Sequence, residues 1–190
     1  LGKTPAQYRR AGAGVSISYA FAPTPFGLMM IGATDRGICF IGFGDGGEEL
    51  LARLRAEYGN ASVEPMTQPY SPQFRVWVDS LAGYLTDDVP KPELPLDIRA
   101  TAFELRVWNY LAGIPSGEVR SYGEVAAALG QPAAARAVAR ACARNPAAVL
   151  IPCHRVIRGS GELGGYRWGL GRKRALIERE RAQRARTQRG

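Results

Sequence analysis

Histidine is almost absent from this sequence, with one residue, His154, among 190. Cysteine is nearly as scarce, since Cys39, Cys142 and Cys153 are an odd number at wide spacings, which does not suggest a disulfide framework. No apolar run approaches the roughly 20 residues that a membrane-spanning helix needs, and the first residues lack the apolar region of a signal peptide. We therefore expect a globular protein of a reducing, cytoplasmic compartment with no membrane partner.

Acidic residues are scarce in the last third of the chain. Residues 133–190 contain 14 Lys and Arg but 3 Asp and Glu, whereas residues 1–132 contain 11 basic and 14 acidic residues. A basic surplus confined to one segment is typical of a polyanionic partner, because neutralising phosphates releases counterions from nucleic acid. The alternative is a solvated basic tail, because residues 181–189 alone supply four of these charges.

Hydrophobic periodicity in the first half predicts strands followed by helices. Residues 15–21 alternate apolar and small side chains, as in a half-buried strand. Two apolar runs, 27–32 and 37–43, are separated by a short Asp- and Gly-containing gap that favours a hairpin. A helix should end at Gly59-Asn60, and a second should begin at Ser71-Pro72. Residues 86–98 contain three prolines and indicate a linker.

The second half has a helical pattern. Thr101 to Glu104 and Ser121 to Glu124 have capping-box spacing, and a further helix is expected over 133–145. The last two helices would form a helix-turn-helix, with Arg136, Arg140 and Arg144 on one face of the second. A buried strand is expected at 149–151 and a final helix near 171–183.

Cys153 and His154 form the candidate reactive site. A thiol attacks as the thiolate, so it needs a base or positive surroundings, which His154 and Arg155 could supply. Neighbours on an extended backbone point to opposite sides, which favours a water relay over direct contact. A buried structural cysteine is one alternative. Zinc is disfavoured because no C-x-x-C spacing exists, and we expect no metal site.

The residues around Cys153 resemble the active-site signature of a known family. Residues 151–156 (IPCHRV) are similar to that of the O6-alkylguanine-DNA alkyltransferases, the methylated-DNA–protein-cysteine methyltransferases. The resemblance continues through residues 117–122 (GEVRSY), 133–145 and 164–169 (GGYRWG). It is continuous over about 97–180, whereas 15–95 fits only by the order of its strands and helices. The form YRWG is similar to the bacterial adaptive-response (Ada-type) branch.

The resemblance implies a small N-terminal α/β domain of ribonuclease H-like fold and a mainly α C-terminal domain with a winged helix-turn-helix. We expect the N-terminal domain at 13–92, a linker at 93–100, the alkyltransferase domain at 101–183 and a basic tail at 184–190. Residues 1–12 resemble the tail of a regulator domain, so the chain could be part of a bifunctional protein. A standalone protein is the alternative.

The resemblance also implies the chemistry of repair. Cys153 would take the alkyl group from O6-alkylguanine, and O4-alkylthymine is a second expected lesion. His154 would accept the thiol proton through a water, and Glu180 would orient the imidazole. Tyr122 would donate its phenol to the leaving base, and Asn145 would brace the turn around the cysteine. Since the thioether is a poor leaving group, each molecule would react once, as a single-turnover methyltransferase without a cofactor.

Duplex DNA is the partner implied, bound by a monomer in the bacterial nucleoid. Arg136 would replace the flipped nucleotide in the base stack, because a thiol reaches the lesion only after the base leaves the stack. The residues expected to contact DNA are Arg136, Tyr122, Ser121, Ala135 and Arg140. The expected pocket residues are Tyr166, Val156 and Arg167, where Arg167 stands at a position that is serine in some family members. Arg155 and Arg158 would strengthen phosphate contact.

Two rival functions remain on the sequence alone. A non-reactive lesion-binding relative would resemble the family, but such proteins replace the cysteine, and Cys153 is present. A DNA-binding regulator would use the same basic helix, with Cys153 merely packed in the core. The sequence leaves open the tolerance for alkyl groups larger than methyl and the preference between guanine and thymine lesions.

Overall fold

The computed structural model describes residues 14–87 and 89–189, which form two compact units. The N-terminal unit contains the described residues up to Arg99 together with Pro146–Leu150. The C-terminal unit contains Ala100–Asn145 and the chain from Ile151 onward. The expectation for residues 1–12 lies outside the described residues. None of the helices described is long and apolar enough to cross a membrane.

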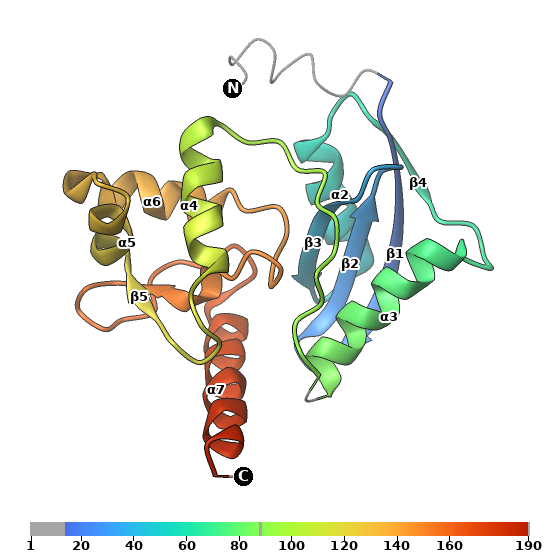
Figure 1. The fold of residues 1–190 in the computed structure, drawn as a ribbon. Helices are drawn as coiled ribbons and strands as arrows, with labels where there is room; N and C mark the ends of the chain where they lie inside the picture. Colours follow the sequence, from blue (N-terminus) through green and yellow to red (C-terminus); the bar gives the residue numbers. More distant parts are fainter. Residues whose placement is uncertain (1–13, 88, 190) are drawn as a thin grey trace. The chain divides into compact units, whose positions relative to one another are not determined.

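A four-stranded sheet forms the centre of the N-terminal unit (Figure 1). Its strands are β1 (Ser16–Thr24), β2 (Gly27–Ala33), β3 (Ile38–Gly44) and β4 (Ser62–Pro65), in the order β3-β2-β1-β4. β1, β2 and β3 pair antiparallel and confirm the predicted strand and hairpin, while β4 pairs parallel with β1. β4 was not predicted from the sequence, because only Val63 among its four residues is buried and no alternation is visible.

Two helices pack against this sheet, α2 (Gly47–Glu57) and α3 (Pro72–Thr86). As predicted, α3 begins after the N-cap Ser71, whose hydroxyl accepts a hydrogen bond from the Phe74 amide at 3.3 Å, with Pro72 in the first turn. The buried faces of the two helices close the core of the unit through Leu50, Leu54, Phe74, Trp77, Val78, Leu81, Tyr84 and Leu85.

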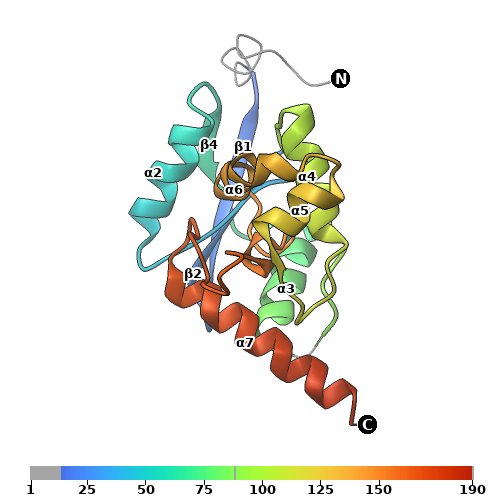
Figure 2. The same cartoon turned by 90° about the vertical axis from the view of Figure 1, so that its left-hand side faces the viewer.

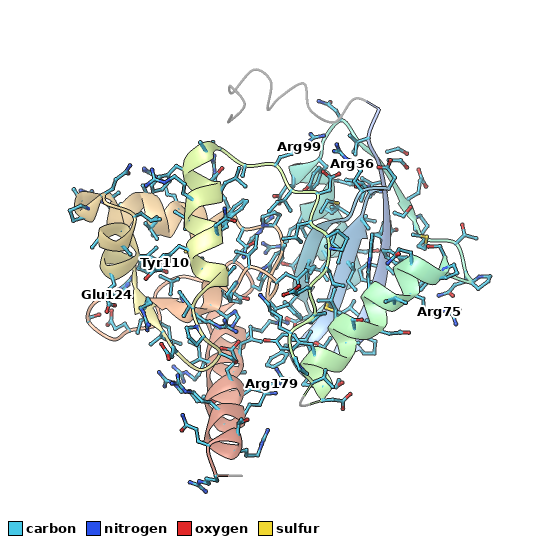
Figure 3. The ribbon with its side chains drawn as sticks, in the orientation of Figure 1. Arg36, Arg75, Arg99, Tyr110, Glu124 and Arg179 are labelled. Carbon is cyan, nitrogen blue, oxygen red and sulfur yellow. The ribbon has the colours of Figure 1, made fainter. Side chains whose placement is uncertain are left out.

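The prediction of a linker at 93–100 is wrong for the middle of that segment. The Ile38 amide donates to Pro95 O at 2.8 Å, and the Asp97 amide donates to Ile38 O at 2.9 Å, so this segment pairs with β3. Gly37 permits the approach, because a Cβ there would lie 2.6 Å from Pro95 O. The exposed Arg36, labelled in Figure 3, forms an ion pair with Asp97 at 2.9 Å. The compact units therefore divide at Arg99, not at residue 92.

Residues 146–150 also belong to the N-terminal unit, although they lie far along the chain. The Ile41 amide donates to Pro146 O at 2.8 Å, and the Ala148 amide donates to Ile41 O at 3.1 Å. The predicted strand at 149–151 is wrong, because Val149 adopts a positive φ of 62° within a tight turn. The prediction that these apolar residues are buried is confirmed. A buried apolar run of three residues, however, does not distinguish a strand from a turn.

The C-terminal unit is mainly helical (Figure 2). Its elements are α4 (Ala102–Ala112), β5 (Arg120–Ser121), α5 (Tyr122–Ala128), the 3-10 turn η1 (Pro132–Ala134), α6 (Ala135–Ala143), the 3-10 turn η2 (Cys153–Arg155), β6 (Val156–Ile157) and α7 (Leu170–Thr187). β5 and β6 pair parallel, and α6 packs against both α4 and α5.

Both predicted capping boxes are present in this unit. Thr101 caps α4 with Glu104, and Ser121 caps α5 with Glu124, which Figure 3 labels. The final helix is longer than expected, since α7 continues to Thr187 through the start of the predicted basic tail. The helix expected over 133–145 begins instead as a 3-10 turn and is α-helical over 135–143.

Candidate active site

Cys153 is the first residue of η2, so its backbone is helical, not extended as the sequence suggested. Its side chain is buried and borders a cavity of about 320 Å³ within the C-terminal unit. The cavity is lined by Tyr122, Ala139, Cys142, Ala143, Cys153, Gly165, Tyr166 and Arg167. Three residues predicted from the sequence, Tyr122, Tyr166 and Arg167, thus share one cavity with the candidate nucleophile.

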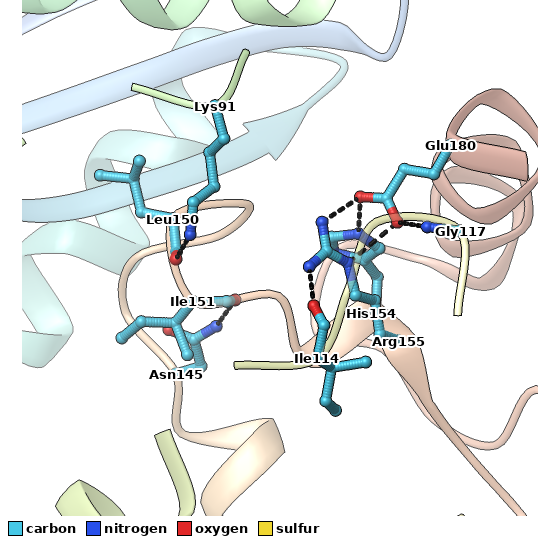
Figure 4. Close-up of polar contacts among 9 residues, drawn as sticks. All are labelled: Lys91, Ile114, Gly117, Asn145, Leu150, Ile151, His154, Arg155 and Glu180. Atoms are coloured by element: carbon cyan, nitrogen blue, oxygen red, sulfur yellow. Dashed lines mark hydrogen bonds and ion pairs between the residues drawn. The ribbon is translucent and has the colours of Figure 1, made fainter. Parts of the chain in front are cut away.

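The Asn145 side chain contacts the thiol directly. It is buried, and its Nδ2 donates to the Ile151 carbonyl at 2.8 Å and lies 3.0 Å from Cys153 Sγ (Figure 4 draws the first of these bonds). These two contacts join the end of α6 to the turn that carries the cysteine. The bracing role of Asn145 stays a prediction.

His154 and Glu180 form a buried hydrogen-bonded pair. The imidazole Nε2 lies 2.8 Å from Glu180 Oε1, and neither residue is more than 1% exposed. With Nε2–H donated to the carboxylate, Nδ1 carries the lone pair, and this atom is buried without a partner among the described residues. Burial lowers the pKa of His154 below its ordinary 6.5, although the Glu180 carboxylate opposes this effect. A neutral imidazole with one unused nitrogen can accept a proton.

Arg155 completes this network (Figure 4). Its Nε and Nη2 donate to the two oxygens of Glu180 at 2.9 and 2.8 Å, and its Nη1 donates to the Ile114 carbonyl. The Gly117 amide also donates to Glu180 at 3.1 Å. Burial would raise the pKa of Glu180, but the hydrogen bonds and charges of His154 and Arg155 outweigh it and hold that pKa well below its usual range.

The predicted phosphate contact of Arg155 is therefore wrong. The side chain is 4% exposed, and the Glu180 carboxylate balances its charge. Arg144 lies at the C-cap of α6 and pairs with Glu104 at 3.2 Å, but its side chain remains 70% exposed. Arg136 and Arg140 are likewise exposed on α6, and Arg158 is exposed and pairs with Glu162.

The Cys153 thiol is held mainly in its protonated form. Burial raises the pKa of Cys153 above its ordinary 9.0, while the Asn145 hydrogen bond and the charges of Lys173 and Arg167 oppose that rise. Lys173 is fully buried, and its Nζ donates to the carbonyls of Val156 and Gly165. Nothing in the sequence distinguishes Lys173, because a lysine in an Arg-rich helix gives no sign that it faces inward.

Tyr122 and Tyr166 supply the phenols of the cavity. Tyr122 begins α5, and a Cβ at Gly164 would lie 3.0 Å from the Tyr122 hydroxyl, so the glycine permits this close approach. Burial raises the pKa of Tyr122 to about 12, which keeps it a hydrogen-bond donor. The hydroxyl of Tyr166 is buried and has no partner among the described residues, so a ligand in the cavity could use it.

The remaining predicted residues lie outside the cavity. Ser121 caps α5, and Ala135 begins α6. Val156 is fully buried and is absent from the cavity lining, and it contributes its carbonyl to Lys173. α6 provides one wall of the cavity through Ala139, Cys142 and Ala143. This wall was not predicted, although the i, i+3, i+4 spacing of the three residues places them on one helix face. Within residues 14–87 and 89–189, no group of three or more His, Cys, Asp or Glu side chains could hold a metal ion.

Comparison with known proteins assigns the chain to a family. Residues 102–182 match the model of the 6-O-methylguanine DNA methyltransferase, DNA binding domain. The methylated-DNA–protein-cysteine methyltransferase of Mycolicibacterium paratuberculosis is 37% identical over 168 residues, which cover 87% of this chain and 93% of that protein. The chain belongs to the methylated-DNA–protein-cysteine methyltransferase family. The resemblance of residues 97–180 to this family is thereby confirmed.

Longer relatives contain additional sequence. The regulatory protein Ada of Salmonella typhimurium is 44% identical over 180 residues, which cover 95% of this chain and 50% of that protein. This methyltransferase-family chain thus spans half the length of the Ada protein. Among solved structures, the Mycobacterium tuberculosis OGT in complex with DNA has a TM-score of 0.72 at 36% identity, covering 87% of this chain and 94% of the other. This similarity supports the α/β fold of a small sheet with helices.

Proposed function

We propose that this protein repairs DNA by moving the alkyl group of O6-alkylguanine, and of O4-alkylthymine, irreversibly onto Cys153. The observation that carries this proposal is the buried Cys153 thiol at the wall of a cavity, followed in the chain by a neutral imidazole that is hydrogen-bonded to Glu180. Family membership supports the reaction class. The protein would act on nucleoid DNA in the cytoplasm of a bacterium, as its bacterial relatives suggest.

The reaction is an in-line displacement at the alkyl carbon. The Sγ–H proton passes through a water to His154 Nδ1, Sγ bonds to the carbon, and the carbon–O6 bond breaks. The electron pair of that bond goes to O6 of guanine, and the Tyr122 hydroxyl donates a hydrogen bond to the departing base. The thioether that remains on Cys153 is a poor leaving group, so one protein molecule repairs one lesion.

The DNA interface is proposed for α5 and α6 as a winged helix-turn-helix, with a ribonuclease H-like N-terminal domain preceding it. Arg136 and Arg140 are exposed on α6, and small alanines flank them, so the helix can approach a groove closely. Arg136 enters the base stack in place of the flipped nucleotide, while Arg140, Ser121 and Ala135 contact the backbone. Such contacts favour binding with little sequence preference.

Intact mass after reaction with methylated duplex DNA tests the proposed function. The wild-type protein should gain the mass of one methyl group, on a peptide that contains Cys153, at one equivalent per molecule. Cys153→Ser should gain nothing. Cys142→Ser is the matched control, because Cys142 lines the same cavity but burial raises its pKa well above the ordinary value and no imidazole follows it. Cys142→Ser should still be methylated.

Two results would overturn the function. An unmodified wild-type protein that still binds the methylated duplex would favour a lesion-binding or regulatory role. A methyl group found on Cys142 would show that Cys142, on another wall of the cavity, is the nucleophile in place of Cys153.

The pH dependence of alkylation should show a plateau. Cys153 has a pKa above 9.0 and His154 a pKa below 6.5, so the neutral thiol–imidazole pair dominates between these values. Lowering the pH protonates His154 only below 6.5, where the rate falls because the base is lost. The measurement is the rate with a free O6-alkylguanine base, which removes DNA binding from the profile. An acid limb with its midpoint above pH 6.5 would contradict the assignment of His154.

A further inference from the structure

Arg167 gives the cavity beside Cys153 a fixed positive charge. Its side chain lines the cavity, and its guanidinium lies 4.9 Å from the centre of the Trp168 ring. Its Nη1 donates to the backbone carbonyl of Asn145 at 3.4 Å, and the Asn145 side chain is 3.0 Å from Cys153 Sγ. Two contacts therefore connect the guanidinium to the attacking sulfur through one residue.

Carboxylates do not line this cavity among the described residues. A second cation lies behind its wall, because buried Lys173 donates to the carbonyl of Gly165, which is a lining residue. The charges of Lys173 and Arg167 both lower the pKa of Cys153, so both positive charges act electrostatically on the sulfur atom. A small and largely apolar cavity with cations and no acid favours a negatively charged group, because low polarity strengthens the attraction.

We propose that Arg167 makes this site favour O6-alkylguanines whose alkyl group ends in a carboxylate, of which O6-carboxymethylguanine is the simplest. This inference rests on the proposed alkyl transfer to Cys153. The planar guanidinium fits a carboxylate with two parallel hydrogen bonds, whereas a methyl group offers it nothing to bind. The charge of the alkyl group, in addition to its size, thus determines which lesions react fastest.

The transfer itself is balanced without any further reactant. Cys153 Sγ bonds to the methylene carbon, the bond from that carbon to O6 breaks, and its electron pair leaves with guanine. The thiol proton goes to His154 through a water. The carboxylate keeps its charge throughout, and the product is S-carboxymethyl Cys153.

Single-turnover rates on three duplexes test the inference. They carry O6-methylguanine, O6-carboxymethylguanine or O6-carbamoylmethylguanine, whose amide has the shape of the carboxylate without its charge. In the wild-type protein we expect the carboxymethyl group to transfer roughly tenfold faster than the carbamoylmethyl group, as one charge-assisted contact allows. Arg167→Gln should reduce that ratio to about one, and Arg167→Lys should restore part of it.

Arg53→Gln is the control for net charge. Arg53 lies on α2 of the N-terminal unit and pairs with Glu49, so its removal should leave the ratio unchanged. If wild-type protein methylates Cys153 but transfers the two larger groups equally fast, the charge preference is refuted while the proposed function stands. If Arg167→Gln slows all three duplexes by the same factor, Arg167 assists the thiol or the leaving base instead, and the inference fails. Absence of any transfer would refute the proposed function itself.

Discussion

Glu180→Ala is expected to lower the free energy of unfolding by about 3–5 kcal/mol, as removal of one partner from a buried ion pair does. Glu180 is 1% exposed and accepts hydrogen bonds from both Nε and Nη2 of Arg155. Without the carboxylate, the Arg155 guanidinium stays buried with its charge unbalanced. Urea denaturation of the two proteins measures the difference.

Glu178→Ala is the matched control for stability, because Glu178 lies two residues earlier on α7 and is exposed. Its free energy of unfolding should change by about 0.5 kcal/mol or less, as for most surface substitutions. Equal stability of Glu180→Ala and the wild-type protein would mean that Arg155 finds another partner, and the buried network would lose its structural role.

Glu180→Gln separates positioning from stability, because glutamine keeps the size of the side chain and removes only its charge. We expect alkylation by a free base to slow by roughly 10- to 100-fold, as removal of the partners that orient metal-binding histidines does. Loss of the carboxylate also disfavours the imidazolium, so the acid limb of the rate should move to lower pH. A purely structural role for Glu180 would leave that limb in place, and wild-type reactivity would contradict the relay.

Arg136→Ala is expected to slow repair of duplex DNA by roughly 100-fold, since the flipped base then leaves an unfilled gap in the stack. Reaction with a free O6-alkylguanine base should change little, because no base has to be flipped. Arg136 is exposed on α6, on the side of the C-terminal unit proposed to face DNA, and has no role in the His154–Glu180 network. The measurement is the ratio of duplex to free-base rates.

Arg140→Ala is the control on the same helix. Arg140 lies one turn further along α6 and is also exposed. As a phosphate contact, it should weaken DNA binding and reduce its salt dependence by about one charge, while the rate on saturating duplex stays near wild type. If Arg136→Ala slowed the reactions with duplex DNA and with the free base by the same factor, the role of Arg136 in base flipping would be refuted.

The sequence determined the features that depend on neighbouring residues. Capping boxes act over three residues, so Thr101 and Ser121 identified the starts of α4 and α5. The adjacency of Cys153 to the single histidine identified the candidate nucleophile, and the surrounding motifs identified the family.

Contacts between residues distant in the sequence fixed the remaining features. Residues 149–151 look like a strand, but their turn follows from pairing of Pro146 and Ala148 with Ile41, more than 100 residues earlier. Residues 95–97 have the composition of a linker, but in the folded chain they pair with Ile38.

Charge was the property that the sequence described least well. The 14 basic residues after position 132 predicted a polyanionic partner, yet Arg155 and Lys173 are buried. A count of charges sums over the segment, whereas burial and pairing depend on where the chain brings each side chain. The sequence therefore identified the candidate nucleophile and the family, and the folded chain determined which arginines remain exposed.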